Sequence, residues 1–199
     1  MSTAETAPRK ADRRTKMWAG VLAGAALCYA ISIPTSGPLG LGGYAPMVFG
    51  VPAALGFFLA RRLRWRGATF IAIAIAAAYY AAYFAAVQVY SWASPKTCLF
   101  CTAAENLPAY GLAGLAGGLV GSLLSFLAFA LIAPDLRDPR ARRIAAVSIG
   151  LLTALGGVTA AVGLAYGGDY PLLGNFVLFT PWQLAFGAAL IALLGRRTV

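Results

Sequence analysis

Six long apolar segments alternate with short polar ones along this chain, and the pattern predicts six membrane-spanning helices. Their expected bounds are residues 17–35, 44–60, 67–92, 103–133, 144–166 and 175–194. A spanning helix needs about 20 mostly apolar residues, and lipid offers the backbone no partner outside a helix or a closed barrel. Because the segments are long and show no two-residue alternation, we expect an all-α, polytopic integral membrane protein.

The positions of the charges add an orientation to this fold. All Lys and Arg residues except Lys96 fall in the N-terminal segment, in the links after the second and fourth expected helices, or at the C-terminus. Cytoplasmic links carry an excess of Lys and Arg. We therefore expect both termini in the cytoplasm, a disordered basic tail at residues 1–16, and location in the inner membrane of a cell.

Composition narrows the possible functions. Hydrophobic residues make up 60% of the chain and charged residues 11%, so the net charge of +10 indicates orientation in a lipid bilayer and no nucleic-acid partner. Histidine is absent, which excludes His-ligated metals and catalysis by imidazole. Three cysteines cannot complete a four-cysteine metal site within one chain. We expect no metal and no cofactor.

A Cys-x-x-Cys motif stands in the link before the fourth expected helix. The predicted topology places Cys98 and Cys101 outside the cytoplasm, where a disulfide persists. Three interpretations remain open. The two cysteines form a redox-active pair acidified by the helix N-terminus, they form a structural disulfide that holds the loop onto the helix, or they stay unpaired.

The redox interpretation rests on a resemblance. The Cys98-x-x-Cys101 motif at the outer end of a helix is similar to that of the membrane enzymes that oxidise disulfide carriers, the DsbB type and the vitamin K epoxide reductases. This resemblance implies an extracytoplasmic thiol–disulfide oxidoreductase. Those families pass electrons on through a second cysteine pair, whereas here only Cys28, in the first expected helix, remains as a relay.

Polar and aromatic side chains gather in the expected outer half of the bundle, whereas the inner halves of the helices contain almost none. A polar residue in a spanning helix normally faces the bundle interior or a wet cavity. An aromatic and amide lining with one carboxylate suits a neutral or cationic small solute. The expected substrate-binding residues are Tyr79, Tyr83, Gln88, Glu105, Asn106, Tyr110, Trp182 and Gln183.

These residues would divide the work of binding. Glu105 would supply charge, the amides of Gln88, Asn106 and Gln183 would orient the solute, and the aromatic residues would form the walls. The Cys98–Cys101 disulfide would hold the loop over the pocket. A structural alternative for Glu105 is to cap the fourth helix, where the macrodipole favours an acid.

The overall plan is similar to that of the substrate-binding subunits of energy-coupling-factor vitamin transporters, with residues 25–32 and 180–183 adding to the resemblance. It implies a solute-binding subunit of a transporter. The glycine pairs Gly114–Gly118 and Gly117–Gly121 permit close helix packing and predict contacts with other membrane subunits. We expect solute binding or transport, favoured over an enzymatic role. The oxidoreductase and an accessory structural subunit remain alternatives.

Overall fold

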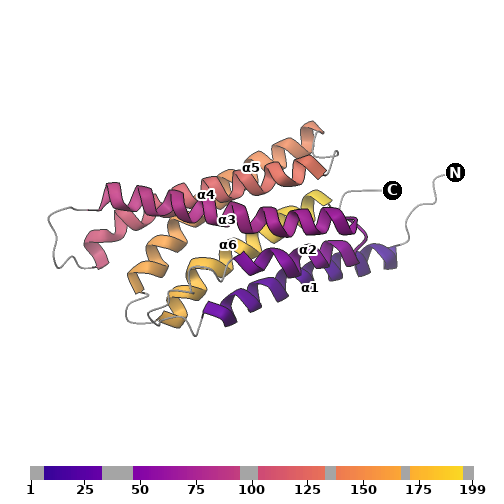
Figure 1. Ribbon diagram of the computed structural model, residues 1–199, viewed down its shortest axis with the longest axis horizontal. Coiled ribbons are helices and arrows are strands. Elements are labelled where there is room, and N and C mark those ends of the chain that lie inside the picture. The colour runs from indigo at the N-terminus through magenta and orange to yellow at the C-terminus, as the bar shows by residue number, and fades with distance from the viewer. Residues whose placement is uncertain (1–6, 33–46, 95–102, 133–137, 167–170, 195–199) are drawn as a thin grey trace.

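The computed structural model describes residues 7–32, 47–94, 103–132, 138–166 and 171–194, and these ranges contain helices joined by short turns, with no strand. The expected all-α fold is confirmed for this part of the chain. The helices are α1 (Ala7–Ser32), α2 (Gly50–Leu59), α3 (Trp65–Ala93), α4 (Ala103–Ile132), α5 (Pro139–Tyr166) and α6 (Pro171–Leu194), as Figure 1 shows.

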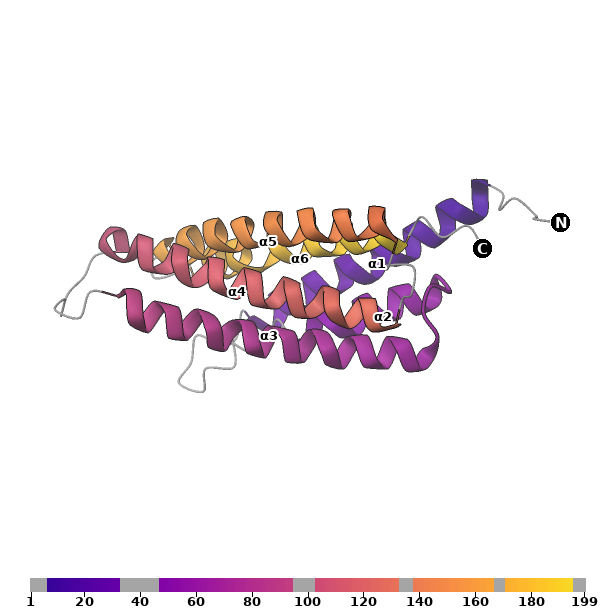
Figure 2. The same ribbon diagram turned by 90° about the horizontal axis from the view of Figure 1, so that it is seen from above.

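The helices form a closed ring in chain order. Each helix packs mainly against the next one, and α6 returns to pack against α1. Neighbours run antiparallel, so the start of α1, the α2–α3 turn, the start of α5 and the end of α6 lie together at one end (Figures 1 and 2). We call this the basic end, because its described residues include Arg61, Arg62, Arg64, Arg66, Arg140, Arg142 and Arg143. At the opposite end, α3 and α4 extend beyond the last turn of α1.

Four helices in the described part of the chain are long and apolar enough to cross a membrane. They cover Trp65–Ala93, Glu105–Ile132, Pro139–Ala165 and Phe176–Leu194. Their outer surfaces expose large apolar side chains such as Ile73, Leu131 and Leu151. A soluble protein rarely exposes so continuous an apolar surface, so the architecture is that of a membrane protein.

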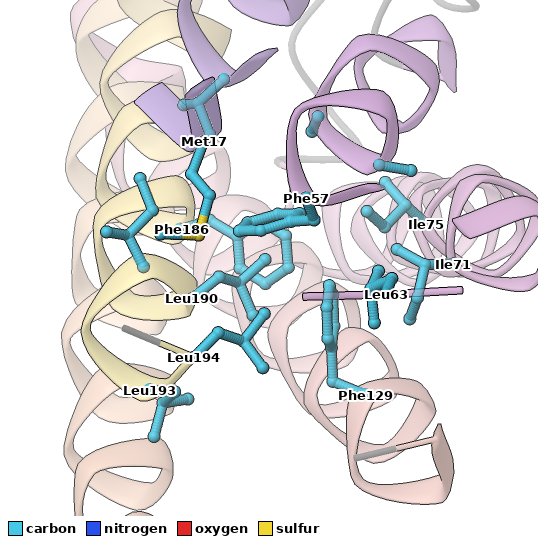
Figure 3. Packing of buried hydrophobic residues seen from close by; sticks show 14 of the residues in the cluster. Met17, Phe57, Leu63, Ile71, Ile75, Phe129, Phe186, Leu190, Leu193 and Leu194 are labelled. Carbon is cyan, nitrogen blue, oxygen red and sulfur yellow. The ribbon is translucent and has the colours of Figure 1, made fainter. Parts of the chain in front are cut away.

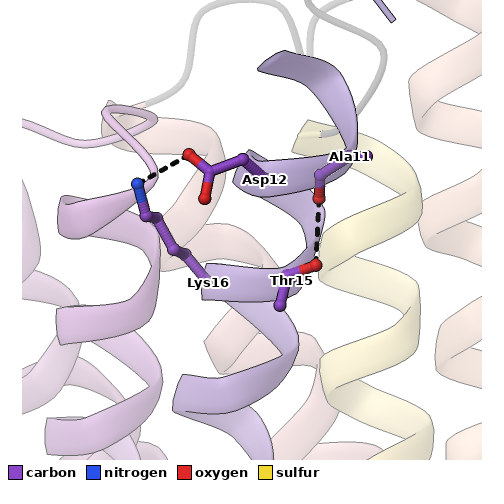
Figure 4. Close-up of polar contacts among 4 residues, drawn as sticks. All are labelled: Ala11, Asp12, Thr15 and Lys16. Carbon is purple, nitrogen blue, oxygen red and sulfur yellow. Dashed lines mark hydrogen bonds and ion pairs between the residues drawn. The ribbon is translucent and has the colours of Figure 1, made fainter. Parts of the chain in front are cut away.

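The two remaining helices differ from the expected spans. The second apolar helix, Met47–Leu59, is shorter than the expected span. Its α-helical part, α2, begins at Gly50 and has Pro52 in its first turn, where the missing proline N–H breaks no helical hydrogen bond. α1 begins at Ala7, well before the expected start at Met17. Its first turns are supported by the Asp12–Lys16 ion pair at 2.7 Å and by the hydrogen bond from Thr15 to the Ala11 carbonyl at 3.1 Å (Figure 4).

The glycines of α4 bring three helix backbones together within the chain. A Cβ atom added at Gly118 would lie 2.9 Å from the Leu152 carbonyl oxygen of α5, and one at Gly117 would lie 3.2 Å from the Ala82 carbonyl oxygen of α3. A Cβ at Gly114 would overlap Gly156 of α5. The predicted close packing therefore occurs between helices of this chain, and contact with other subunits stays a prediction.

Candidate functional site

A cluster of large apolar side chains fills the interior of the ring toward the basic end. Phe186 of α6 is its centre, with ring centroids 5.6 Å from Phe126 and 6.5 Å from both Phe49 and Phe129. Figure 3 shows several helices converging around Phe186, with Met17 and Leu190 beside it. We call this cluster the aromatic plug. Its buried side chains fill the interior of the ring toward the basic end.

The interior beyond the plug has a different character. Every large, fully buried side chain among the described residues belongs to the plug cluster except Cys28. Further from the basic end, most buried residues of α3, α4 and α5 are small. They are alanines and glycines, among them Ala78, Ala82, Ala109, Ala113 and Ala160. Larger side chains that make contacts in this part of the ring come from α1, α3 and α6 and include Cys28, Tyr79, Phe179, Trp182 and Gln183.

Trp182 and Gln183 lie directly on the plug. The Trp182 ring stacks on Phe186, with centroids 5.3 Å apart and planes 18° apart. The same indole reaches across the ring toward α4, because a Cβ at Gly121 would lie 3.8 Å from its Cζ2. Pro181 stands inside α6 just before this pair, and a proline there removes a backbone hydrogen bond and tends to kink the helix.

Gln183 joins α6 to α1 through a polar contact. Its Nε2 donates to the Cys28 Sγ at 3.0 Å, and the two side chains are only 3% and 1% exposed. Tyr79 of α3 lies within electrostatic range of Cys28, and its ring meets Phe179 of α6 edge to face at 6.3 Å. Cys28, Tyr79, Trp182 and Gln183 thus form one deep polar group on three helices.

Two polar atoms of this group have no hydrogen-bond partner among the described residues. They are the Trp182 indole Nε1 and the Gln183 amide Oε1, and both are buried. Leaving such a group unpaired costs about 1–3 kcal/mol. Exchanging the amide's O and N would let the Cys28 thiol donate to Oε1 but would leave Nε2 without an acceptor, so half of the amide stays unpaired in either orientation.

Two other hydroxyl groups in the helices, one buried and one partly buried, are satisfied locally. Ser122 donates to the Gly118 carbonyl at 2.6 Å, and Thr153 donates to the Ile149 carbonyl at 2.8 Å. Such back-bonding is the usual fate of hydroxyl groups in a helix. An indole N–H and a glutamine amide cannot reach their own backbone in this way, so Trp182 and Gln183 need a partner from elsewhere.

The structure places the other predicted site residues outside the deep polar group, although Tyr83 lies within electrostatic range of Tyr79. Glu105 and Gln88 are exposed, and Tyr83 is 49% exposed. Tyr110 is half-buried and stacks on Tyr90, with centroids 5.3 Å apart and planes 6° apart, which joins α4 to α3 near the opposite end. Asn106 is also half-buried. Cys98 and Cys101 lie outside the described residues.

Sequence reasoning placed Cys28 inside the membrane as a redox relay but missed its contact with Gln183. The two residues are 155 positions apart, and no local sequence pattern predicts that α6 packs against α1. Phe179, one turn before Gln183 and packed on Tyr79, was also missed. Its spacing of four from Gln183 on one helix face was the available signal.

The described residues contain no group of three or more His, Cys, Asp or Glu side chains that could hold a metal ion. Comparison with protein-family models, curated proteins and solved structures finds no match to this chain. Any function must therefore be inferred from the ring, the plug and the deep polar group themselves.

Proposed function

We propose that this chain is an inner-membrane protein with six spanning helices and both termini in the cytoplasm, and that it binds or transports a small solute. In this proposal the solute enters from the extracytoplasmic side and is held by the deep polar group. The Cys98–Cys101 disulfide closes the loop above it. Glu105 and Gln88, being exposed, act at most at the entrance.

The observation that carries the proposal is the pair of unpartnered atoms on neighbouring residues, Trp182 Nε1 and Gln183 Oε1. One is a donor and the other an acceptor. A solute that offers the complementary pair would remove the cost of both unpaired groups at once. Binding sites commonly contain buried polar groups whose hydrogen bonds are completed only when a ligand is present.

The surroundings of the two atoms suggest the chemical class of the solute. No charged side chain belongs to the deep polar group, which favours a neutral molecule over a cation. The stacked indole of Trp182 and the edge-to-face pair of Tyr79 and Phe179 offer flat apolar surfaces. We therefore propose a neutral, planar molecule that carries both a carbonyl and an N–H group.

The direction of entry is argued from packing and charge. The aromatic plug fills the ring between the deep polar group and the basic end. The basic end carries the described arginines, as cytoplasmic ends of membrane proteins do. Fusion of a reporter that is active only in the cytoplasm to each terminus tests this orientation. Activity at both ends is expected, and silence at either one would reject it.

A ligand screen tests the site. Neutral heterocycles with a lactam or cyclic imide group would be added to the purified chain, and the shift in its melting midpoint measured. We expect a compound that stabilises the wild type, with affinity about tenfold weaker for Trp182→Phe, which keeps the stacking but loses the N–H donor. The same loss is expected for Gln183→Leu.

Gln88→Leu is the matched control, because it makes the same chemical change at an exposed position of α3. It should keep the full effect of the compound. If Gln88→Leu weakens binding as much as Gln183→Leu does, the solute binds elsewhere and the proposal for the deep polar group is wrong.

A further inference from the structure

A basic groove opens at the basic end, between α1 and the turn that joins α2 to α3. It measures about 690 Å³ and is lined by Lys16, Phe58, Leu59, Arg61, Arg62, Leu63 and Arg64. Four of these residues are cationic and none is acidic. Lys16 is already bound to Asp12 at 2.7 Å (Figure 4), so Arg61 and Arg64 are the exposed cations that the groove offers to a ligand.

The turn that presents these arginines has an unusual residue at its centre. Arg61 adopts a left-handed conformation with φ of 56°. Its N–H donates to the Phe58 carbonyl at 2.8 Å and the N–H of Arg62 donates to the Phe57 carbonyl at 2.9 Å, which is the Schellman ending of a helix. Glycine normally occupies this position because any other side chain strains it. An arginine at this position therefore lowers the stability of the turn but places a positive charge at the groove.

The groove also has an apolar side. Phe58 and Leu59 line it and are themselves exposed, and they continue the apolar surface of α2 formed by Val51 and Leu55. Next to the groove, Trp65 is exposed and carries the Arg66 guanidinium 5.4 Å above its ring. An exposed Trp beside cations is typical of the membrane–water interface. The groove therefore has cationic side chains on one side and exposed apolar side chains on the other.

We propose that this groove binds the headgroup of an anionic phospholipid. The lipid phosphate lies against Arg61 and Arg64, the positive potential of Arg62 adds to the attraction, and an acyl chain follows Phe58 and Leu59. Guanidinium groups bind phosphate through paired charged hydrogen bonds. Basic pockets between membrane helices on the cytoplasmic side are suited to such lipids. A free anion would use the arginines but would gain nothing from the apolar side, which favours the lipid.

The test is a lipid titration of the purified full chain in detergent, with bound lipid counted by native mass spectrometry. Phosphatidylglycerol is the probe, and phosphatidylcholine with the same acyl chains is the neutral reference. We expect tight binding of phosphatidylglycerol only. Arg64→Gln should weaken it about tenfold or more, as expected for the loss of charged hydrogen bonds. Arg64 makes no side-chain cap to α3, so this variant keeps the helix intact.

Arg66→Gln is the matched control, since it removes the same charge two residues away and outside the groove. It should weaken binding by less than about threefold. Arg61→Gly separates binding from folding, because glycine fits the left-handed turn. It should melt at or above the wild-type temperature and still lose lipid affinity.

Three results would overturn the proposal. Equal losses for Arg64→Gln and Arg66→Gln would mean diffuse attraction to the basic end. Undiminished lipid binding by Arg61→Gly would mean that the strained arginine has no part in it. Displacement of phosphatidylglycerol by millimolar inorganic phosphate would assign the groove to a soluble anion.

Discussion

Replacing Gln183 with leucine should make the protein more stable. The variant loses the hydrogen bond from Nε2 to the Cys28 Sγ, which is worth about 0.5–1.5 kcal/mol, but it also removes the unpaired buried Oε1, which costs about 1–3 kcal/mol. Leucine and glutamine have similar volumes, so neither a cavity nor overpacking is expected. The net gain is about 1 kcal/mol, or about 2–4 °C in Tm for a chain of this length.

The assay is the fraction of protein that remains monodisperse on size-exclusion chromatography after heating in detergent. Gln88→Leu provides the control, because an exposed position should change stability by less than about 0.5 kcal/mol. The result follows from the solute proposal, in which the amide is kept for binding at the expense of stability. A midpoint for Gln183→Leu at or below the wild-type value would refute the argument from the unpaired oxygen.

The remaining predictions concern packing and the outer loop. Gly156→Ala should destabilise the bundle by about 1–3 kcal/mol, because its Cβ would lie 2.7 Å from the Gly114 carbonyl oxygen; Gly150→Ala, on the same helix but with open space around it, should stabilise by up to about 1 kcal/mol. Equal effects in thermal unfolding would contradict the α4–α5 contact. Phe129→Ala should cost about 3–5 kcal/mol, and a smaller loss would show that the plug is loosely packed. Differential alkylation in intact membranes should find Cys98 and Cys101 joined in a bond that resists reduction until the protein unfolds; ready exchange would favour the oxidoreductase.

The sequence predicted the helical fold well because long apolar segments have few alternatives in lipid. Its errors lie at helix ends, where local bonds decide the boundary. α5 begins at Pro139, before the expected residue 144, because proline fits the first helical position and the Arg142 N–H bonds the Asp138 carbonyl at 3.0 Å. Hydropathy cannot detect such a start, since the first turns of α5 are basic.

The candidate site was predicted only in part, because the sequence does not show how deeply each polar residue is buried. Trp182, Gln183 and Tyr79 belong to the deep polar group, whereas Glu105 and Gln88 face outward. Which face of a helix points into the ring depends on its neighbours, and the neighbours are set by contacts such as those between α1 and α6 at opposite ends of the chain. The contact between Cys28 and Gln183 could not be predicted for a similar reason, because the two residues are 155 positions apart in the sequence.

The most direct test of an outward-facing solute site is the side from which Cys28 can be labelled. In a chain with Cys98→Ser and Cys101→Ser, Cys28 is the only thiol. A small charged methanethiosulfonate, which does not cross the bilayer, would be added to membrane vesicles of either orientation and the labelling rate measured. We predict faster labelling from the extracytoplasmic side, because the aromatic plug blocks the cytoplasmic approach. Faster labelling from the cytoplasmic side, or labelling only after unfolding, would contradict the account.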